Sequence, residues 1–277
     1  MLPPKMYHQE FDSPEELQDA INCFWYTAID FNEQASSFEV TPDGYTEIIF
    51  YFGSNLKISR NGVFHSMPSP FMMGLLNQPV HFHTKNKVEV IGIRCYPWTV
   101  FDLLGLPSGE KGVQTFEHPI AELQSNLNKC IETGKIEDAI HQIKHYFLDA
   151  KSHIPANSML FKAGVAMRGA NGTMLVSEVA EAAHATVRTL ERKFKQSSGH
   201  TVKDVSALMR FEQVRNQLWS DPDTNIASLA HEVGYSDQSH LIREFKRYSG
   251  VTPAAFARKT KKGRQIMGDD FVVFVQS

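Results

Sequence analysis

Basic side chains recur at helical spacing in two short segments of this 277-residue chain. Arg188, Arg192 and Lys195 lie three or four positions apart, and Arg243 and Lys246 repeat that spacing further along. Residues three or four apart share one face of a helix, so each set would form a basic stripe. Arginine donates paired hydrogen bonds to the edge of guanine, and both residue types bind phosphate. The chemistry that these residues predict is contact with DNA.

Each basic stripe lies in a segment with the pattern of a helix-turn-helix. Residues 226–257 predict a short helix, a turn and a second helix, and residues 176–200 repeat the pattern less strongly. A helical hairpin with a basic face is often only solvated surface. The repeat at an offset of 50 residues, from 179–180 to 229–230, favours a duplicated functional unit instead.

The residues between the paired helices suit close packing and a tight turn. Ala180 and Ala230 are small enough for the second helix to cross near the first. Gly234 tolerates a left-handed backbone, which the turn requires. The matching place in the first unit falls near Ala183 or His184, where that conformation is less favourable.

The second helix of each unit has a predicted cap, a buried face and an exposed face. Thr186 in the first unit, and Ser236 or Asp237 in the second, are good N-cap types. Apolar pairs spaced by four residues predict the buried faces: Leu190 with Phe194, and Leu241 with Phe245. The other side chains point outward: Arg188, Glu191, Arg192 and Lys195 in one helix, and Ser239, His240, Arg243 and Lys246 in the other.

Charge is distributed unevenly along the chain. The net charge is −3. Residues 1–157 contain 11 Lys and Arg against 19 Asp and Glu, a net of −8, so residues 158–277 contain 17 against 12, a net of +5. This asymmetry is typical of a nucleic-acid binder with a separate module.

Residues 175–258 resemble the DNA-binding domain of the AraC/XylS family of bacterial transcription regulators. The residues that carry the resemblance in the first half are Ala180, Leu190, Arg192, Phe194, Lys195 and Gly199. Those in the second half form a denser match: Ile226, Leu229, Ala230, Val233, Gly234, Tyr235, Asp237, Gln238, Ser239, His240, Arg243, Phe245, Lys246, Gly250, Val251 and Pro253. The chain departs from the family pattern in its first turn, which lacks glycine, and at Val214, where alanine is common.

The resemblance implies a seven-helix domain in which a central helix, about residues 202–219, joins two units that enter successive major-groove segments. Arg210, Phe211, Val214 and Leu218 would lie on its joining faces. The implied base contacts are Arg188, Glu191, Arg192, Ser239, His240 and Arg243. The implied phosphate contacts are Thr186, Lys195, Ser236, Gln238, Lys246 and Arg247.

The first 118 residues predict an antiparallel, β-rich domain. Aromatic and β-branched runs at 23–29, 45–52 and 88–96 are broken by turn signals such as 42–44. This spacing predicts a barrel or sandwich, and the resemblance implies a cupin-like sensor or dimerisation domain. The fold class is therefore α+β, with a β-rich N-terminal domain and an all-α C-terminal domain.

Two helices are expected between these domains, within residues 119–157. Their apolar residues recur at helical spacing, from Leu123 to Ile131 and from Ile136 to Phe147. The stripes would form a dimer seam or pack on their own domain. A break at 155–158 predicts the boundary of the DNA-binding domain, 158–260, and residues 261–277 form a tail whose apolar run would need cover.

Several residues in the β-rich domain are candidates for binding an effector. Arg94 lies in an apolar strand, where it would pair with an acid such as Glu47 or meet an anionic effector. Aromatic residues, Trp25, Tyr51 and Trp98 among them, would line an apolar pocket or form ordinary core. His81 and His83 would share a strand face, but without a firm third ligand they do not predict a metal site, and we expect no cofactor.

The three cysteines have no pairing or zinc-ligand pattern, which favours a reducing cytoplasm. Neither a signal peptide nor an apolar run long enough to span a membrane is expected. The sequence predicts an AraC-type regulator that binds double-stranded DNA and a small-molecule effector, acts as a homodimer, and contacts RNA polymerase if it is an activator. The alternatives are an N-terminal domain that only dimerises and, less favoured, a barrel enzyme linked to a DNA-binding domain.

Overall fold

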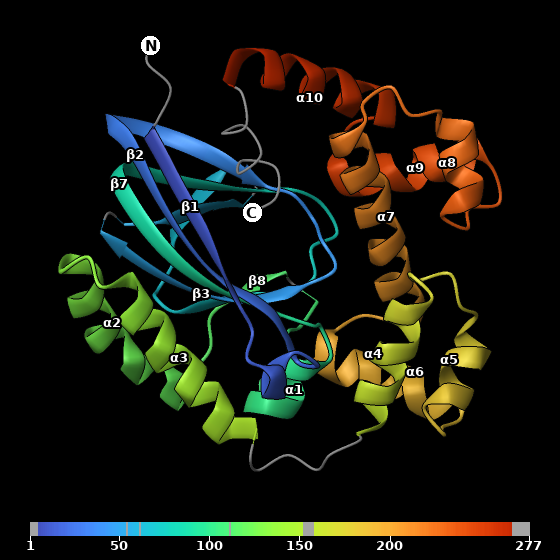
Figure 1. Ribbon diagram of the computed structural model, residues 1–277, viewed down its shortest axis with the longest axis horizontal. Coiled ribbons are helices and arrows are strands. Elements are labelled where there is room, and N and C mark those ends of the chain that lie inside the picture. The colour runs from blue at the N-terminus through green and yellow to red at the C-terminus, as the bar shows by residue number, and fades with distance from the viewer. Residues whose placement is uncertain (1–4, 54, 61, 111, 152–157, 268–277) are drawn as a thin grey trace.

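The computed structural model describes residues 5–53, 55–60, 62–110, 112–151 and 158–267. A curved β-sheet with flanking helices forms one side of the molecule, and a group of helices forms the other (Figure 1). The predicted α+β class, with a β-rich N-terminal part and an all-α C-terminal part, is confirmed. The predicted break at 155–158 falls mostly outside the described residues, as does the apolar run of the tail at 271–275.

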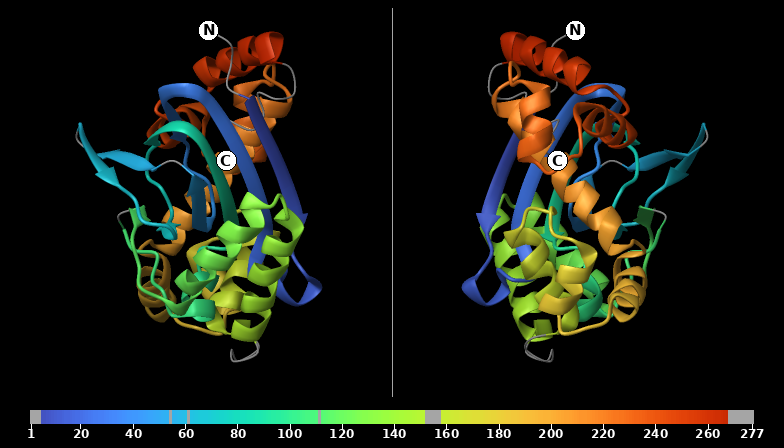
Figure 2. Two further views of the ribbon diagram at one scale, coloured as in Figure 1. Left: turned by 90° about the vertical axis from the view of Figure 1, so that its left-hand side faces the viewer. Right: turned by 90° about the vertical axis from the view of Figure 1, so that its right-hand side faces the viewer.

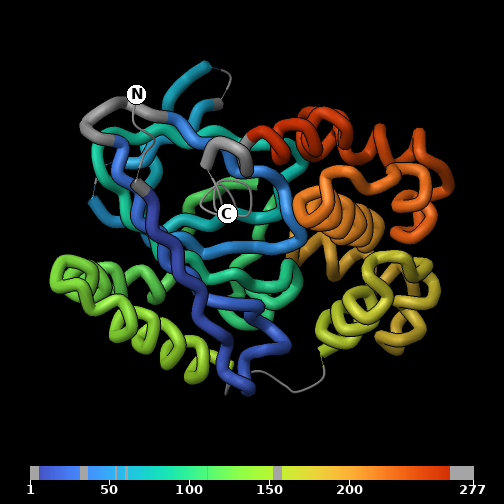
Figure 3. The backbone as a smooth tube through the Cα atoms, turned by 45° about the horizontal axis from the view of Figure 1, so that its top comes forward, coloured from blue at the N-terminus to red at the C-terminus, as the bar shows by residue number. Residues whose placement is uncertain are grey.

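The strands form one eight-stranded antiparallel sheet within the described residues, in the order β1-β2-β7-β3-β6-β8. The strands are β1 (Lys5–Asp12), β2 (Ile21–Val40), β3 (Thr46–Gly53), β4 (Lys57–Arg60), β5 (Val63–Ser66), β6 (Phe71–Met73), β7 (Val80–Cys95) and β8 (Val113–Gln114). The β4–β5 hairpin pairs with β7 and projects from the sheet, as the side views show (Figure 2). The long strands β2 and β7 curl around the domain (Figure 3).

Alternating side chains give the sheet two apolar faces. Phe24 and Ile48 belong to a core shared with the flanking helices, whereas their neighbours Trp25 and Ile49 belong to a second core on the concave side. Such alternation follows from the period of two residues in a strand. Gly92 in β7 leaves room for Trp25, because a Cβ there would lie 2.0 Å from the indole ring.

Short helices and two long ones cover the convex face of the sheet. They are η1 (Glu15–Leu17), α1 (Thr99–Leu104), η2 (Pro119–Glu122), α2 (Leu123–Glu132) and α3 (Ile136–Lys151). Leu127, Ile131, Ile140 and Phe147 are buried in the same core as the sheet. The interpretation of these apolar stripes as a dimer seam is therefore wrong, because their own sheet covers them.

Seven helices make up the described helical domain, as the resemblance implies. They are α4 (Met159–Gly169), α5 (Val176–Ala182), α6 (Val187–Ser198), α7 (Val202–Ser220), α8 (Ile226–Glu232), α9 (Gln238–Ser249) and α10 (Pro253–Met267). The central helix α7 runs between the pair α5–α6 and the pair α8–α9 (Figure 1). The predicted central helix at 202–219 is confirmed to within one residue.

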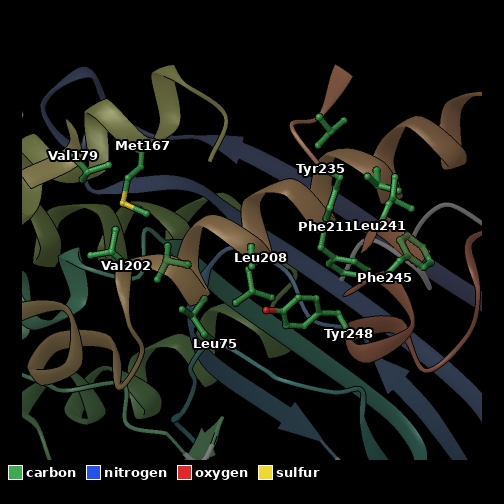
Figure 4. Close-up of a cluster of buried hydrophobic side chains, with 14 of the residues drawn as sticks. Leu75, Met167, Val179, Val202, Leu208, Phe211, Tyr235, Leu241, Phe245 and Tyr248 are labelled. Carbon is green, nitrogen blue, oxygen red and sulfur yellow. The ribbon is translucent and has the colours of Figure 1, made fainter. Parts of the chain in front are cut away.

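One hydrophobic core extends from the helical domain into the sheet domain. Trp98 and Leu75 of the sheet domain belong to the same cluster as Met167, Val202 and Phe194 (Figure 4 labels Leu75, Met167 and Val202). The Trp98 ring lies 6.2 Å from that of Phe194. Trp98 was a candidate for the effector pocket, but its ring is buried in the core between the two domains. A large apolar ring is stable at a domain contact when side chains of both domains cover it.

Gly164 in α4 allows this contact, because a Cβ at that position would lie 2.0 Å from the Trp98 ring. We expect Gly164→Ala to lower the free energy of unfolding by about 1–3 kcal/mol through overpacking. Gly169→Ala, at the end of the same helix with nothing within 4 Å, is the matched control. Urea unfolding of the full chain measures both, and equal stability of the two variants would contradict this account of the domain contact.

Candidate nucleic-acid interface

The two helix-turn-helix units have the same turn geometry although only one turn contains glycine. The amide of Ala185 donates to Ala180 at 2.9 Å, and that of Tyr235 donates to Ala230 at 2.8 Å. The residue before each donor is left-handed, with φ of 52° at His184 and 77° at Gly234. The first turn therefore uses a non-glycine residue in a conformation that costs more for a side chain with a Cβ.

The N-caps of the second helices show where the two units differ. Thr186 caps α6 by accepting from the amide of Thr189, and Asp237 caps α9 by accepting from the amide of His240. Ser236, the alternative cap, contacts the His240 ring at 3.1 Å instead. Equivalent residues of the two units are therefore 50 positions apart up to the turn, as for Ala185 and Tyr235. They are 51 positions apart from the cap onward, as for Thr186 and Asp237.

Helices α6 and α9 bury the predicted apolar faces and expose the predicted basic ones. Leu190, Phe194, Leu241 and Phe245 have no exposed surface. The exposed residues of the predicted contact set are Thr186, Arg188, Arg192, Lys195, Ser236, Gln238, Ser239, Arg243, Lys246 and Arg247. The sheet domain therefore leaves both basic surfaces accessible.

Two predicted base contacts already have partners within the helical domain. Glu191 is partly buried and accepts a hydrogen bond from the amide of Val202 at 3.2 Å, so it caps the central helix. His240 is also partly buried, and its ring lies 3.8 Å from the Glu244 carboxylate. Their sequence positions suit base contact equally well, and only the fold reveals these internal contacts.

Arg210 connects the two units through the middle of α7. Its Nη1 donates to the carbonyl of Gly172, before the first unit, at 2.8 Å. Its Nη2 lies 3.5 Å from the Glu244 carboxylate in α9, and its guanidinium lies 5.3 Å from the centre of the Tyr235 ring. Helical spacing places Arg210 on a joining face, but these three partners could not be predicted from spacing alone.

Apolar packing completes the connection between α7 and the second unit. The Phe211 ring lies 5.1 Å from that of Phe245 and 5.2 Å from that of Tyr248 (Figure 4). Val214, which departs from the family pattern, is fully buried in the same cluster as Leu218. The larger side chain at this position is thus accommodated in the core.

Comparison with known proteins assigns this helical domain. A family described as "Helix-turn-helix domain" matches residues 179–259. RipA of Corynebacterium diphtheriae, an HTH-type transcriptional regulator, is 35% identical over 79 residues, which are 28% of this chain and 23% of RipA. AraC-like transcription regulators of Streptomyces match the chain over 83 residues at 31–32% identity. The helical domain of this chain is therefore a DNA-binding domain of the AraC/XylS type.

Other matches cover further or longer parts of the chain. A domain of unknown function, DUF6597, matches residues 9–117. The transcriptional activator RhrA of Rhizobium meliloti is 30% identical over 106 residues, which are 38% of this chain and 33% of RhrA. The chain thus covers about a quarter to a third of these two relatives. ToxT of Vibrio cholerae matches 93% of this chain and 98% of its own at 10% identity and a TM-score of 0.45.

Glu47, Arg94 and Trp25 meet on the concave side of the sheet domain. Glu47 and Arg94 are register partners on β3 and β7, and Arg94 Nε donates to Glu47 Oε1 at 2.8 Å. Trp25 Nε1 donates to the same oxygen at 3.1 Å. Of the two interpretations of Arg94, the ion pair with Glu47 is confirmed. Burial raises the pKa of Glu47, and the adjacent guanidinium opposes that rise.

A mostly apolar cavity of about 60 Å³ adjoins this ion pair. Trp25 and Glu47 line it together with Ile49 and Val90. Tyr51, the remaining effector candidate, is not among its lining residues, and its hydroxyl donates to the carbonyl of Met67 at 2.6 Å. Of the five predicted effector residues, the structure brings together Trp25, Glu47 and Arg94.

The two strand histidines have ordinary neighbours. His81 lies 3.6 Å from the Glu39 carboxylate, and the His83 ring lies edge-on to Phe64. In the part of the chain that the structure describes, no group of three or more histidine, cysteine or acidic residues could hold a metal ion. No helix among the same residues is long and apolar enough to cross a membrane.

Removing Arg94 should make stability depend on pH. In Arg94→Met the buried Glu47 loses its partner, so its pKa rises further, and we expect a loss of about 3–5 kcal/mol. A carboxyl with a folded-state pKa above its unfolded value of about 4.3 loses stability as pH rises between the two values. The loss relative to the wild type should therefore grow from about pH 5 to about pH 8.

Urea unfolding across this pH range measures the effect. The double variant Arg94→Met/Glu47→Gln is the control, because it removes both charges and should recover most of the loss without the pH dependence. A loss in Arg94→Met that is the same at every pH would contradict the ion-pair account.

Proposed function

We propose that the protein is a sequence-specific, DNA-binding transcription regulator of the AraC type and not an enzyme. The observation that supports this most strongly is the pair of exposed basic helices, α6 and α9, attached to one central helix. Their relatives among known proteins are transcription regulators. A helix of this kind reads base edges from the major groove, and two on one support would read successive segments of a duplex.

The proposed contacts divide into base and phosphate sets. Arg188, Arg192, Ser239 and Arg243 would reach base edges, and a bidentate contact from Arg192 or Arg243 to guanine is worth about 1–3 kcal/mol. Glu191 and His240 remain proposed base contacts. Each would have to contact a base while it also keeps its hydrogen bond within the helical domain. The proposed phosphate contacts are Thr186, Lys195, Ser236, Gln238, Lys246 and Arg247.

The sheet domain would bind a small effector beside Trp25, Glu47 and Arg94 and shift the arrangement of the DNA-binding domains. We propose a homodimer in the cytoplasm, with RNA polymerase as a partner if the protein activates transcription. The apolar stripes of α2 and α3 are buried, so a dimer would use a different surface. A sheet domain that only dimerises is the alternative, and the apolar cavity beside a buried ion pair favours the sensor.

Single substitutions in α9 should separate base contacts from phosphate contacts. Arg243→Ala should relax preference at one base position, with a loss of about 1–3 kcal/mol on the preferred sequence. Lys246→Ala should weaken all sequences alike and reduce the salt slope of binding by about 1. Selection from a random duplex library, followed by titrations at several salt concentrations, measures both effects.

Lys129→Ala, an exposed charge removed from α2 in the sheet domain, is the matched control and should change neither property. If Arg243→Ala and Lys246→Ala both keep the base preference and the salt slope of the wild type, the proposed roles are wrong. Failure of the wild-type protein to bind any duplex at low salt would overturn the proposed function itself.

A further inference from the structure

A second pocket, larger and more polar than the sheet cavity, lies between the two domains. Its volume is about 300 Å³, compared with about 60 Å³ for the cavity beside Glu47. Tyr45 and Tyr96 of the sheet domain form one side, and Arg168, Glu212 and Gln213 of the helical domain contribute to the other. Its size reaches the lower end of the range for small-molecule sites.

Arg168 is held in place without an acidic partner. Its guanidinium lies 3.8 Å from the centre of the Tyr96 ring, and that ring stacks on Trp98 at 5.6 Å with an angle of 8° between the planes. Among the described residues it forms no ion pair within 4 Å. Stacking uses the face of a guanidinium and leaves its N–H groups free to bind an anion in the plane.

Glu212 gives the same pocket an acceptor. It receives a hydrogen bond from the amide of Gly44, and its Oε1 lies 3.8 Å from Arg215 Nη2. Burial raises the pKa of Glu212, so a donor from a ligand would stabilise its charged form. Gln213 donates to the carbonyl of Asn171 at 2.7 Å, which places amide groups at the pocket wall.

We propose that this interdomain pocket binds a small molecule with a carboxylate at one end and a hydrogen-bond donor a few bonds away, as in a free α-amino acid or 2-hydroxy acid. The carboxylate would bind the unpaired Arg168, and the ammonium or hydroxyl group would donate to Glu212. A simple dicarboxylate would be repelled by Glu212, and a simple amine would leave Arg168 without its anion. This site is separate from the sheet cavity and extends the proposed function.

The position of the pocket gives such a ligand a route to regulation. Tyr45 and Tyr96 belong to the sheet domain, whereas Arg168 and Glu212 belong to the helical domain, so a bound molecule would contact both. If the two domains change their relative arrangement on DNA, ligand and DNA affect each other's affinity by the same factor. Ligand binding itself needs no DNA, so it can be tested separately.

Thermal unfolding of the full chain without DNA tests the proposal. The probes are the individual natural L-amino acids, the matching 2-hydroxy acids, and the amines that lack the carboxylate, each at millimolar concentration. We expect at least one amino or hydroxy acid to raise Tm in a saturable manner, because a ligand that binds only the folded state stabilises it. The matching amine should have no effect.

Substitutions then place the ligand. Arg168→Met keeps an unbranched stem but removes the guanidinium, and it should weaken binding at least about tenfold, because charge-assisted hydrogen bonds are lost. Arg168→Lys should lose less, and Lys162→Met, on the same helix but outside the pocket, should bind as the wild type does. Circular dichroism confirms that each variant is folded.

Two results would overturn the proposal: no amino or hydroxy acid stabilises the wild type, or the stabilisation persists in folded Arg168→Met and Glu212→Gln. Calorimetric titration of the wild type with any stabilising compound separates binding at one site from a general solvent effect. If the protein binds these probes but no DNA, the ligand proposal is supported and the proposed function is wrong. If it binds DNA but none of the probes, the proposed function is supported and the ligand proposal is wrong.

Discussion

The contacts of Arg210 and Phe211 along α7 make the two helix-turn-helix units one body. Arg210 reaches the carbonyl of Gly172 beside the first unit and Glu244 in the second, and Phe211 packs on Phe245 of the second recognition helix. Because protein interiors are close-packed, a buried aromatic contact of this kind fixes the position of α9 relative to α7. Without it, the two basic helices would be independent, and neither their separation nor their orientation would match successive turns of a duplex.

The sheet domain holds the two units unequally. Gly199, at the end of α6, is so close to the sheet domain that a Cβ would lie 2.4 Å from Gly109, whereas the corresponding Gly250 has nothing within 4 Å. The central helix is also held, because Arg215 Nη1 donates to the carbonyl of Pro42 at 3.1 Å. A movement of the sheet domain would therefore displace α6 and α7 directly. It would displace α9 only through the packing of α9 on α7.

The sequence predicted well whatever depends on local pattern. Helix spacing, caps and the repeat located α6, α7 and α9, and strand alternation predicted the antiparallel sheet. Features that depend on neighbours distant in sequence were missed or misassigned. Trp98 looks like any pocket aromatic until Gly164 is seen to face it, and Glu191 looks like a base contact until it is seen to cap α7. The stacking of Arg168 on Tyr96 joins residues 72 positions apart, and no local pattern contains it.

Because both basic helices are attached to α7, we expect the bound protein to protect a defined pattern of nucleotides from cleavage. Hydroxyl-radical footprinting of the wild-type protein on its strongest selected duplex measures this pattern at single-nucleotide resolution. The account predicts two protected segments on one face of the duplex, separated by about one helical turn of 10 base pairs, for each bound chain. A single protected segment per chain, or two segments whose separation varies between sites, would contradict a rigid two-unit reader.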